Sequence, residues 1–156
     1  QRGEPRARMR TSPQSVCGLR PTGGGASGRS LRTMHVLVLD PNPTVRCALE
    51  ALFESEPDMS ATVGEGLDVL NERRCFDAAL VDERIAGAIG ERERATLDSL
   101  SRAAPVVVMG MGEPESYARV HVAAGAAGYW PKDGDIDALV ALVRAVVARV
   151  PAQRAA

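Results

Sequence analysis

The chain has 156 residues, enough for one domain of ordinary size, and its 45% apolar and 25% charged residues are typical of a folded protein. The net charge of −1 conceals an asymmetry, because residues 1–33 carry seven Arg and one Glu, which leaves the remainder acidic. An acidic folded part argues against non-specific binding of nucleic acid by the domain itself.

Gly, Ser, Pro and Arg dominate residues 1–33, and no apolar period appears there. Such a segment cannot bury enough apolar surface to offset its ordering entropy, so we expect it to be a disordered basic extension. One interpretation is an arm for nucleic acid or an acidic partner. The other, which we favour, is an extension outside the natural protein, because Met34 opens the globular pattern. We expect the domain at 34–152 and a short tail at 153–156.

Predicted strands and helices then alternate along the chain. An apolar run at 35–39 predicts a strand ending at Asp40, and Pro43 suits the first turn of a helix that continues to about residue 55. Weaker patterns predict a second strand and a second helix, at 59–63 and 67–74.

The second half repeats this alternation. A third strand at 76–81 ends at Asp82, and a fourth at 105–109 ends at Gly110. A glycine-containing loop is predicted at 85–90. Helices are predicted at 92–102, 114–124 and 136–150, and a short strand is predicted at 127–130. In the last helix one apolar stripe comprises Ile136, Leu139, Val140, Val143, Val147 and Val150.

Five strands alternating with helices predict a parallel sheet with right-handed crossovers, covered on both faces. No G-x-G-x-x-G or P-loop motif follows a strand, which argues against a dinucleotide or ATP site. No apolar run approaches the roughly 20 residues of a membrane span, and no apolar segment follows the Arg-rich N-terminus as in a secretory signal. We expect a cytoplasmic protein that does not contact membranes.

Charged residues stand where the predicted strands end. In open parallel sheets functional residues gather at the carboxyl ends of the strands, where we expect Asp40 and Asp82 side by side with Lys132, the only lysine in the chain, approaching from the other flank. Paired carboxylates suit a hard divalent cation such as Mg²⁺. The cation and the lysine together can neutralise an incoming phosphoryl group, and one carboxylate can act as its nucleophile.

The same residues resemble the receiver domains of two-component response regulators. MHVLVLDPNPTVR is similar to their opening strand and acidic turn, FDAALVDERIAGAIG to the strand around their phosphoacceptor, PVVVMGM to their fourth strand, and AAGAAGYWPKD to the segment that ends in their lysine. The resemblance covers residues 34 to about 150. It implies an α/β, flavodoxin-like (βα)5 doubly wound sheet with strand order 2-1-3-4-5.

Carried over by position, the resemblance implies a role for six residues. These are Asp82 as phosphoacceptor, Lys132 and Gly110 as phosphoryl-binding residues, Asp40, Asp82 and the backbone carbonyl of Arg84 as Mg²⁺ ligands, and Tyr129 as the switch aromatic.

Two positions depart from the family pattern. Pro41 stands where receivers usually have a second acid, and Gly110 stands where they have Ser or Thr. Proline offers no metal ligand, so the Mg²⁺ site is weakened. Two hypotheses therefore stay open: a receiver phosphorylated on Asp82, and a pseudo-receiver that acts as a phosphorylation-independent interaction or ligand-binding module.

The resemblance also implies partners. We expect a signalling module in transcription regulation rather than an enzyme, phosphorylated by a sensor histidine kinase. It would form a homodimer through the face made by the fourth helix, fifth strand and last helix. DNA would be bound only through an output domain absent from this chain.

Overall fold

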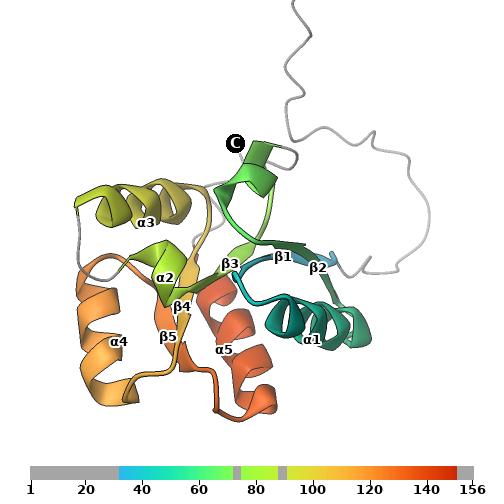
Figure 1. The fold of residues 1–156 in the computed structure, drawn as a ribbon. Coiled ribbons are helices and arrows are strands. Elements are labelled where there is room, and N and C mark those ends of the chain that lie inside the picture. The colour runs from blue at the N-terminus through green and yellow to red at the C-terminus, as the bar shows by residue number, and fades with distance from the viewer. Residues whose placement is uncertain (1–31, 72–74, 88–90, 151–156) are drawn as a thin grey trace, which may run out of the picture.

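The structure is a computed structural model that describes residues 32–71, 75–87 and 91–150. One parallel sheet lies at its centre, with strands in the order β2-β1-β3-β4-β5 (Figure 1). The strands are β1 (Met34–Leu39), β2 (Met59–Gly64), β3 (Ala78–Asp82), β4 (Val106–Gly110) and β5 (Gly128–Pro131). The predicted fold class and strand order are therefore confirmed.

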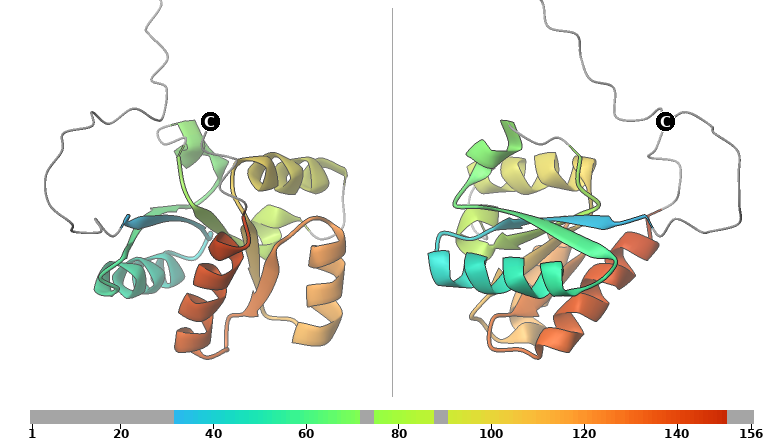
Figure 2. Two further views of the ribbon diagram at one scale, coloured as in Figure 1. Left: turned by 180° about the vertical axis from the view of Figure 1, so that it is seen from behind. Right: turned by 90° about the vertical axis from the view of Figure 1, so that its right-hand side faces the viewer.

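Helices cover both faces of the sheet, as the views from behind and from the side show (Figure 2). Those flanking the strands are α1 (Pro43–Ser55), the 3-10 helix η1 (Leu67–Asn71), α2 (Glu83–Ala86), α3 (Glu91–Ala103), α4 (Pro114–Ala123) and α5 (Ile136–Ala148). Buried residues of α1 and α5 share one apolar core, and those of α2 and α3 share another.

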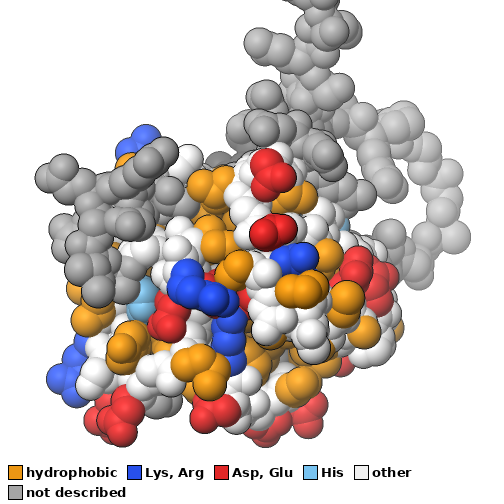
Figure 3. Space-filling model, viewed as in Figure 1, with side chains coloured by type: hydrophobic (Ala, Val, Ile, Leu, Met, Phe, Trp, Pro, Cys, Tyr) orange, Lys and Arg blue, Asp and Glu red, His pale blue; other side chains and the backbone are white. Residues whose placement is uncertain are grey.

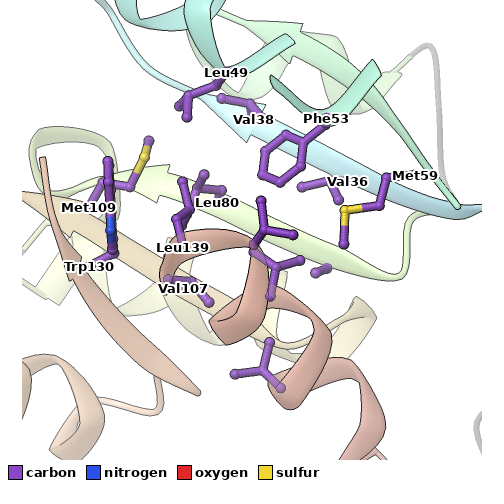
Figure 4. Packing of buried hydrophobic residues seen from close by; sticks show 14 residues of the cluster. Val36, Val38, Leu49, Phe53, Met59, Leu80, Val107, Met109, Trp130 and Leu139 are labelled. Carbon is purple, nitrogen blue, oxygen red and sulfur yellow. The ribbon is translucent and has the colours of Figure 1, made fainter. Parts of the chain in front are cut away.

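The alternation of side chains along β1 shows why two cores form. Val36 and Val38 point into the core shared with α1 and α5, whereas Leu37 and Leu39 point into the core shared with α3. Phe53, the largest fully buried side chain, lies against the first core (Figure 4). A strand buried on both faces needs a continuous apolar run, and that run is what made the strand recognisable in the sequence.

Two predicted elements differ from the structure. The segment after β2 forms the short 3-10 helix η1 rather than a full helix; Leu67 is 38% exposed, and Val69 packs against the core. Residues 72–74 of that prediction lie outside the described residues. The predicted loop at 85–90 begins instead as helix α2, directly after Asp82, and Gly87 with a φ of 60° ends it. Residues 88–90 also lie outside the described part.

The last helix corrects the predicted apolar stripe at one end. Ile136, in its first turn, is 48% exposed, whereas Val146, expected only to widen the stripe beyond the buried face, is 1% exposed and belongs to the core. The end of α4 agrees with the prediction, because Gly125 follows it with a φ of 103°.

The chain ends are covered only in part. The predicted disordered extension at 1–33 lies outside the described residues except for Arg32 and Thr33, and the predicted tail at 153–156 lies outside them as well. Arg32 donates to Asp77 at 2.7 Å. Among the described residues, no helix combines the length and the apolar character that crossing a membrane requires.

Two substitutions in α5 test whether its buried middle or its exposed first turn carries the stability. Leu139→Ala should lower the free energy of unfolding by about 2–5 kcal/mol, because the side chain is fully buried and leaves a cavity. Ile136→Ala, three residues earlier on the same helix, should change it by less than about 1 kcal/mol. Urea denaturation of both variants measures the difference, and equal losses would contradict the described orientation of α5.

Candidate functional site

The carboxyl ends of the strands bring two acids and one lysine together. Asp40 follows β1, Asp82 ends β3, and Lys132 follows β5. The Lys132 ammonium donates to Asp40 Oδ2 at 2.5 Å and also to Asp82 Oδ2. Both aspartates are buried, at 0% and 2% exposure. We call these three residues the carboxylate–lysine triad. It joins strand ends that lie 92 and 50 residues apart in the chain.

Asp82 is held from both sides. Its Oδ1 accepts hydrogen bonds from the backbone N–H of Arg84 at 2.8 Å and from the Arg84 guanidinium at 2.9 Å, so the same carboxylate begins helix α2. Burial by itself raises the pKa of Asp82, but the hydrogen bonds from Arg84 and Lys132 outweigh it and leave the pKa below its usual value. Asp82 is therefore ionised at neutral pH.

Asp40 is fixed by the start of α1. Its Oδ1 accepts from the backbone N–H of Asn42 at 2.7 Å, and its backbone carbonyl accepts from the Arg46 guanidinium at 2.6 Å. Asn42 in turn caps α1 by accepting from Thr44 N–H. Pro41 contributes no side-chain donor or acceptor to this turn.

Lys132 is positioned by its backbone as well as its side chain. Its N–H donates to the carbonyl of Gly110 at 2.8 Å, which ties the turn after β5 to the end of β4. Burial lowers the pKa of Lys132, but its hydrogen bonds to Asp40 and Asp82 outweigh this and raise it above the ordinary value. The ammonium therefore stays charged between the two carboxylates. The space-filling view shows basic and acidic side chains next to one another on this side of the molecule (Figure 3).

Gly110 and Tyr129, two further predicted site residues, lie beside the triad. Gly110 is buried at the end of β4, and the Tyr129 hydroxyl accepts from Gly112 N–H at 3.2 Å and donates to the Gly112 carbonyl at 3.3 Å. Burial raises the pKa of Tyr129. Tyr129 is thus held against the loop between β4 and α4.

Sequence reasoning missed the roles of Glu83 and His121. The Glu83 carboxylate points towards Gly110, and a Cβ on Gly110 would lie 2.1 Å from its Oε2. His121 of α4 is 1% exposed and stacks on Tyr129, with ring centroids 5.6 Å apart. Glu83 stands next to Asp82 in the sequence, but nothing in the pattern indicates which way its side chain turns. His121 is one turn after Tyr117 on α4, and that spacing was the only available signal.

The predicted metal ligands have suitable chemistry, but donors already occupy them. Carboxylate and carbonyl oxygens are the ligands that Mg²⁺ prefers. All four carboxylate oxygens of Asp40 and Asp82 accept hydrogen bonds, from Asn42, Arg84 and Lys132. The part of the chain that the structure describes contains no group of three or more His, Cys, Asp or Glu side chains arranged around a metal position. Arg84, expected to contribute its carbonyl, brings its guanidinium to the site. Each carboxylate oxygen has two lone pairs, so Asp40 and Asp82 can hold Mg²⁺, with these donors competing for the same oxygens.

A pH titration of stability tests the burial of His121. Burial lowers the pKa of His121, although the charge of Glu83 acts in the opposite direction. In the unfolded chain His121 takes up a proton near pH 6.5, whereas in the folded protein it does so only at a lower pH. The unfolded state therefore binds more protons, and the free energy of unfolding should fall as the pH drops from 7 to 5. The slope from one group is at most about 1.4 kcal/mol per pH unit.

His121→Phe should remove this part of the slope. Because His35 remains in both proteins, the difference between the two stability profiles isolates His121. Parallel profiles for wild type and His121→Phe would show that the ring is not buried in its neutral form.

Comparisons with known proteins agree with this geometry. No protein-family model matches the chain. The nitrate/nitrite response regulator protein NarP of Escherichia coli (strain K12) is 28% identical over 118 residues, which cover 71% of this chain and 54% of that protein. The chain therefore spans about half the length of this curated relative.

Solved structures share the fold. The receiver domain of the putative response regulator NarL from Mycobacterium tuberculosis has a TM-score of 0.62 at 19% identity, covering 76% of this chain and 99% of that one. A LuxR-family response regulator from Aurantimonas sp. SI85-9A1 has a TM-score of 0.61 at 25% identity, covering 74% and 86%. Full-length FixJ from B. japonicum has a TM-score of 0.64 at 20% identity, covering 79% and 62%. The described part of this chain therefore has the fold of response-regulator receiver domains and is similar to them in sequence.

Proposed function

We propose that this domain accepts a phosphoryl group on Asp82 as part of a phosphorelay. The observation that carries the proposal is the triad, in which one ammonium, on a side chain only 12% exposed, bonds two buried carboxylates at the carboxyl ends of three strands. An ammonium in that place neutralises the charge that a phosphoryl group brings next to Asp82.

The chemistry needs only a carboxylate nucleophile. Asp82 is ionised because its donors lower its pKa, so no general base is required. One of its oxygens attacks phosphorus, the new O–P bond replaces the bond between phosphorus and the donor, and the donor leaves with the bonding electrons. Mg²⁺, when bound, would supply further positive charge on the phosphoryl oxygens, held by Asp40, Asp82 and the carbonyl of Arg84.

The proposal extends to partners by likeness to the relatives. A sensor histidine kinase would be the phosphoryl donor, and a homodimer through α4, β5 and α5 would be the output of switching. DNA would be reached through an output domain, since this chain spans about half of NarP. We propose a cytoplasmic role in transcription regulation, as a signalling module rather than an enzyme.

One structural observation favours the alternative of a pseudo-receiver. The space beside Gly110 is already filled by the Glu83 carboxylate and the Tyr129 hydroxyl, 2.1 and 2.6 Å from where a Cβ would lie. A domain whose switch region is occupied without phosphorylation can present one fixed surface to a partner or ligand.

Intact-protein mass spectrometry after incubation with Mg²⁺ and acetyl phosphate tests the proposed function. Wild type should gain one phosphoryl adduct. Asp82→Asn should gain none, because an amide is not a nucleophile of this kind. Asp98→Asn, an exposed aspartate of α3, should behave like wild type and controls for the loss of one charge. An unmodified wild type that is shown to be folded would sink the proposal and leave the pseudo-receiver.

Arg84→Ala tests whether the guanidinium competes with Mg²⁺. Arg84 has a 63% exposed side chain, so water screens its ion pair with Asp82 and the guanidinium competes only weakly for Asp82 Oδ1. Its removal should therefore tighten Mg²⁺ binding roughly two- to fivefold. Arg119→Ala, an exposed arginine of α4, is the matched control for net charge. Calorimetric titration gives both affinities, and equal affinities for Arg84→Ala and wild type would rule out the competition.

A further inference from the structure

A second polar cluster lies beside the triad and has no part in the proposed phosphotransfer. It comprises Glu83, His121 and Tyr129, gathered around the loop that runs from Gly110 to Gly112; we call it the Glu83 cluster. Two of its members have buried side-chain atoms without a hydrogen-bond partner among the described residues: Oε2 of Glu83 and both ring nitrogens of His121. Polar atoms in that condition are rare in folded proteins and call for an explanation.

We propose that the Glu83 carboxylate is a built-in anion that fills the space beside Gly110 and holds the loop between β4 and α4, so that an incoming oxyanion has to displace it. The displacement part rests on the proposed function, because it assumes that oxyanions enter beside Asp82. The part about the loop stands on the contacts alone.

The Glu83 carboxylate lies against the backbone of the loop. Its Oε1 accepts a long, weak hydrogen bond from the backbone N–H of Met111 at 3.5 Å. Its Oε2 and the Tyr129 hydroxyl lie 2.1 and 2.6 Å from the same point, where a Cβ on Gly110 would stand. With a side chain on Gly110 the Glu83 carboxylate, the end of a flexible side chain, would have to move away, so the glycine leaves this space open to it.

Aromatic side chains surround the loop that the Glu83 carboxylate contacts. The Tyr129 hydroxyl is bonded to both the N–H and the carbonyl of Gly112, and His121 stacks on the Tyr129 ring at an interplanar angle of 5°. The ring of Tyr117 closes the other side of the loop, 2.3 Å from where a Cβ on Gly112 would stand. The loop is thus held by three aromatic rings together with the Glu83 carboxylate.

The charge of Glu83 also reaches the surroundings of Asp82. Together with the hydrogen bond to Asp82, it helps to raise the pKa of Arg84, the guanidinium that pairs with Asp82. Two cations, Lys132 and Arg84, already pair with Asp82, and the Met111 N–H is engaged by Glu83. An oxyanion that reaches Asp82 meets a third carboxylate beside it, and like charges at close range repel. Glu83 therefore takes the place that a bound oxyanion would occupy beside Gly110. Its negative charge also repels an oxyanion that approaches Asp82.

Hydrogen exchange of the loop amides in the unphosphorylated protein tests the structural part. Glu83→Ala should raise the exchange rates of Met111 and Gly112 at least about tenfold relative to wild type, because the anion that holds the loop is gone. Glu113→Ala removes a carboxylate from the same loop, but that side chain is exposed and makes no capping hydrogen bond, so it should leave these rates unchanged. Unchanged rates in Glu83→Ala would overturn the proposal.

Binding of inorganic phosphate in the presence of Mg²⁺ tests the displacement. Glu83→Gln keeps the shape of the side chain and loses its charge, so it remains informative if Glu83→Ala does not fold. It should bind phosphate roughly three- to tenfold more tightly than wild type, with Glu113→Gln at the wild-type value. Equal affinity in Glu83→Gln and wild type would overturn the displacement.

The two proposals fail in different ways. If acetyl phosphate leaves wild type unmodified while Glu83→Ala loosens the loop, Asp82 is not a phosphoacceptor and Glu83 still holds the loop. If wild type is modified and the Glu83 variants match it in exchange and phosphate binding, phosphotransfer stands and the role of Glu83 is refuted.

Discussion

The ion pairs of Lys132 with Asp40 and Asp82 are the interaction on which the site depends. Two buried carboxylates side by side repel each other, and burying either without a partner costs several kcal/mol. One ammonium shared by both offsets that cost and links the end of β5 to the ends of β1 and β3. The sheet order makes this possible, because only strands that run parallel bring these distant residues to one edge. Removing any member of the triad should therefore disturb the charge state of the other two.

Compared with the receiver pattern, the carboxyl ends of the strands have one acidic residue fewer after β1 and one more after β3. Pro41 supplies no carboxylate after β1, while Glu83 adds one after β3. The added carboxylate does not join the triad but turns towards Gly110, in the space that a larger residue would occupy. Arg84 balances part of the charge by donating to Asp82 from both its backbone and its guanidinium. The site thus has one possible metal ligand fewer, at Pro41, and has internal cations and an internal anion, Glu83, instead. This composition fits weak phosphorylation of Asp82 as well as none.

Much of this was predictable from the sequence, for physical reasons. The doubly covered strands read as continuous apolar runs, and parallel topology then placed Asp40, Asp82 and Lys132 together without knowledge of any side-chain contact. What could not be predicted depends on individual hydrogen bonds and on space. Helix α2 begins early because Asp82 caps it through Arg84 N–H. Glu83 turns towards β4 because Gly110 lacks a Cβ, a relation between two strands that neither segment reveals alone. Ile136 is exposed although it fits the apolar stripe, because it lies in the first turn of α5, and periodicity alone does not show where burial begins.

Because Lys132 is the only lysine, selective ¹⁵N-lysine labelling would give a single side-chain signal from the centre of the site. Its ammonium protons should exchange slowly with water at neutral pH, and its pKa should lie above the ordinary lysine value, because two carboxylates hold it. Asp82→Asn should speed the exchange and lower the pKa. An ammonium that exchanges and titrates like a free surface lysine, and that ignores Asp82→Asn, would contradict the triad and with it the proposed phosphoacceptor site.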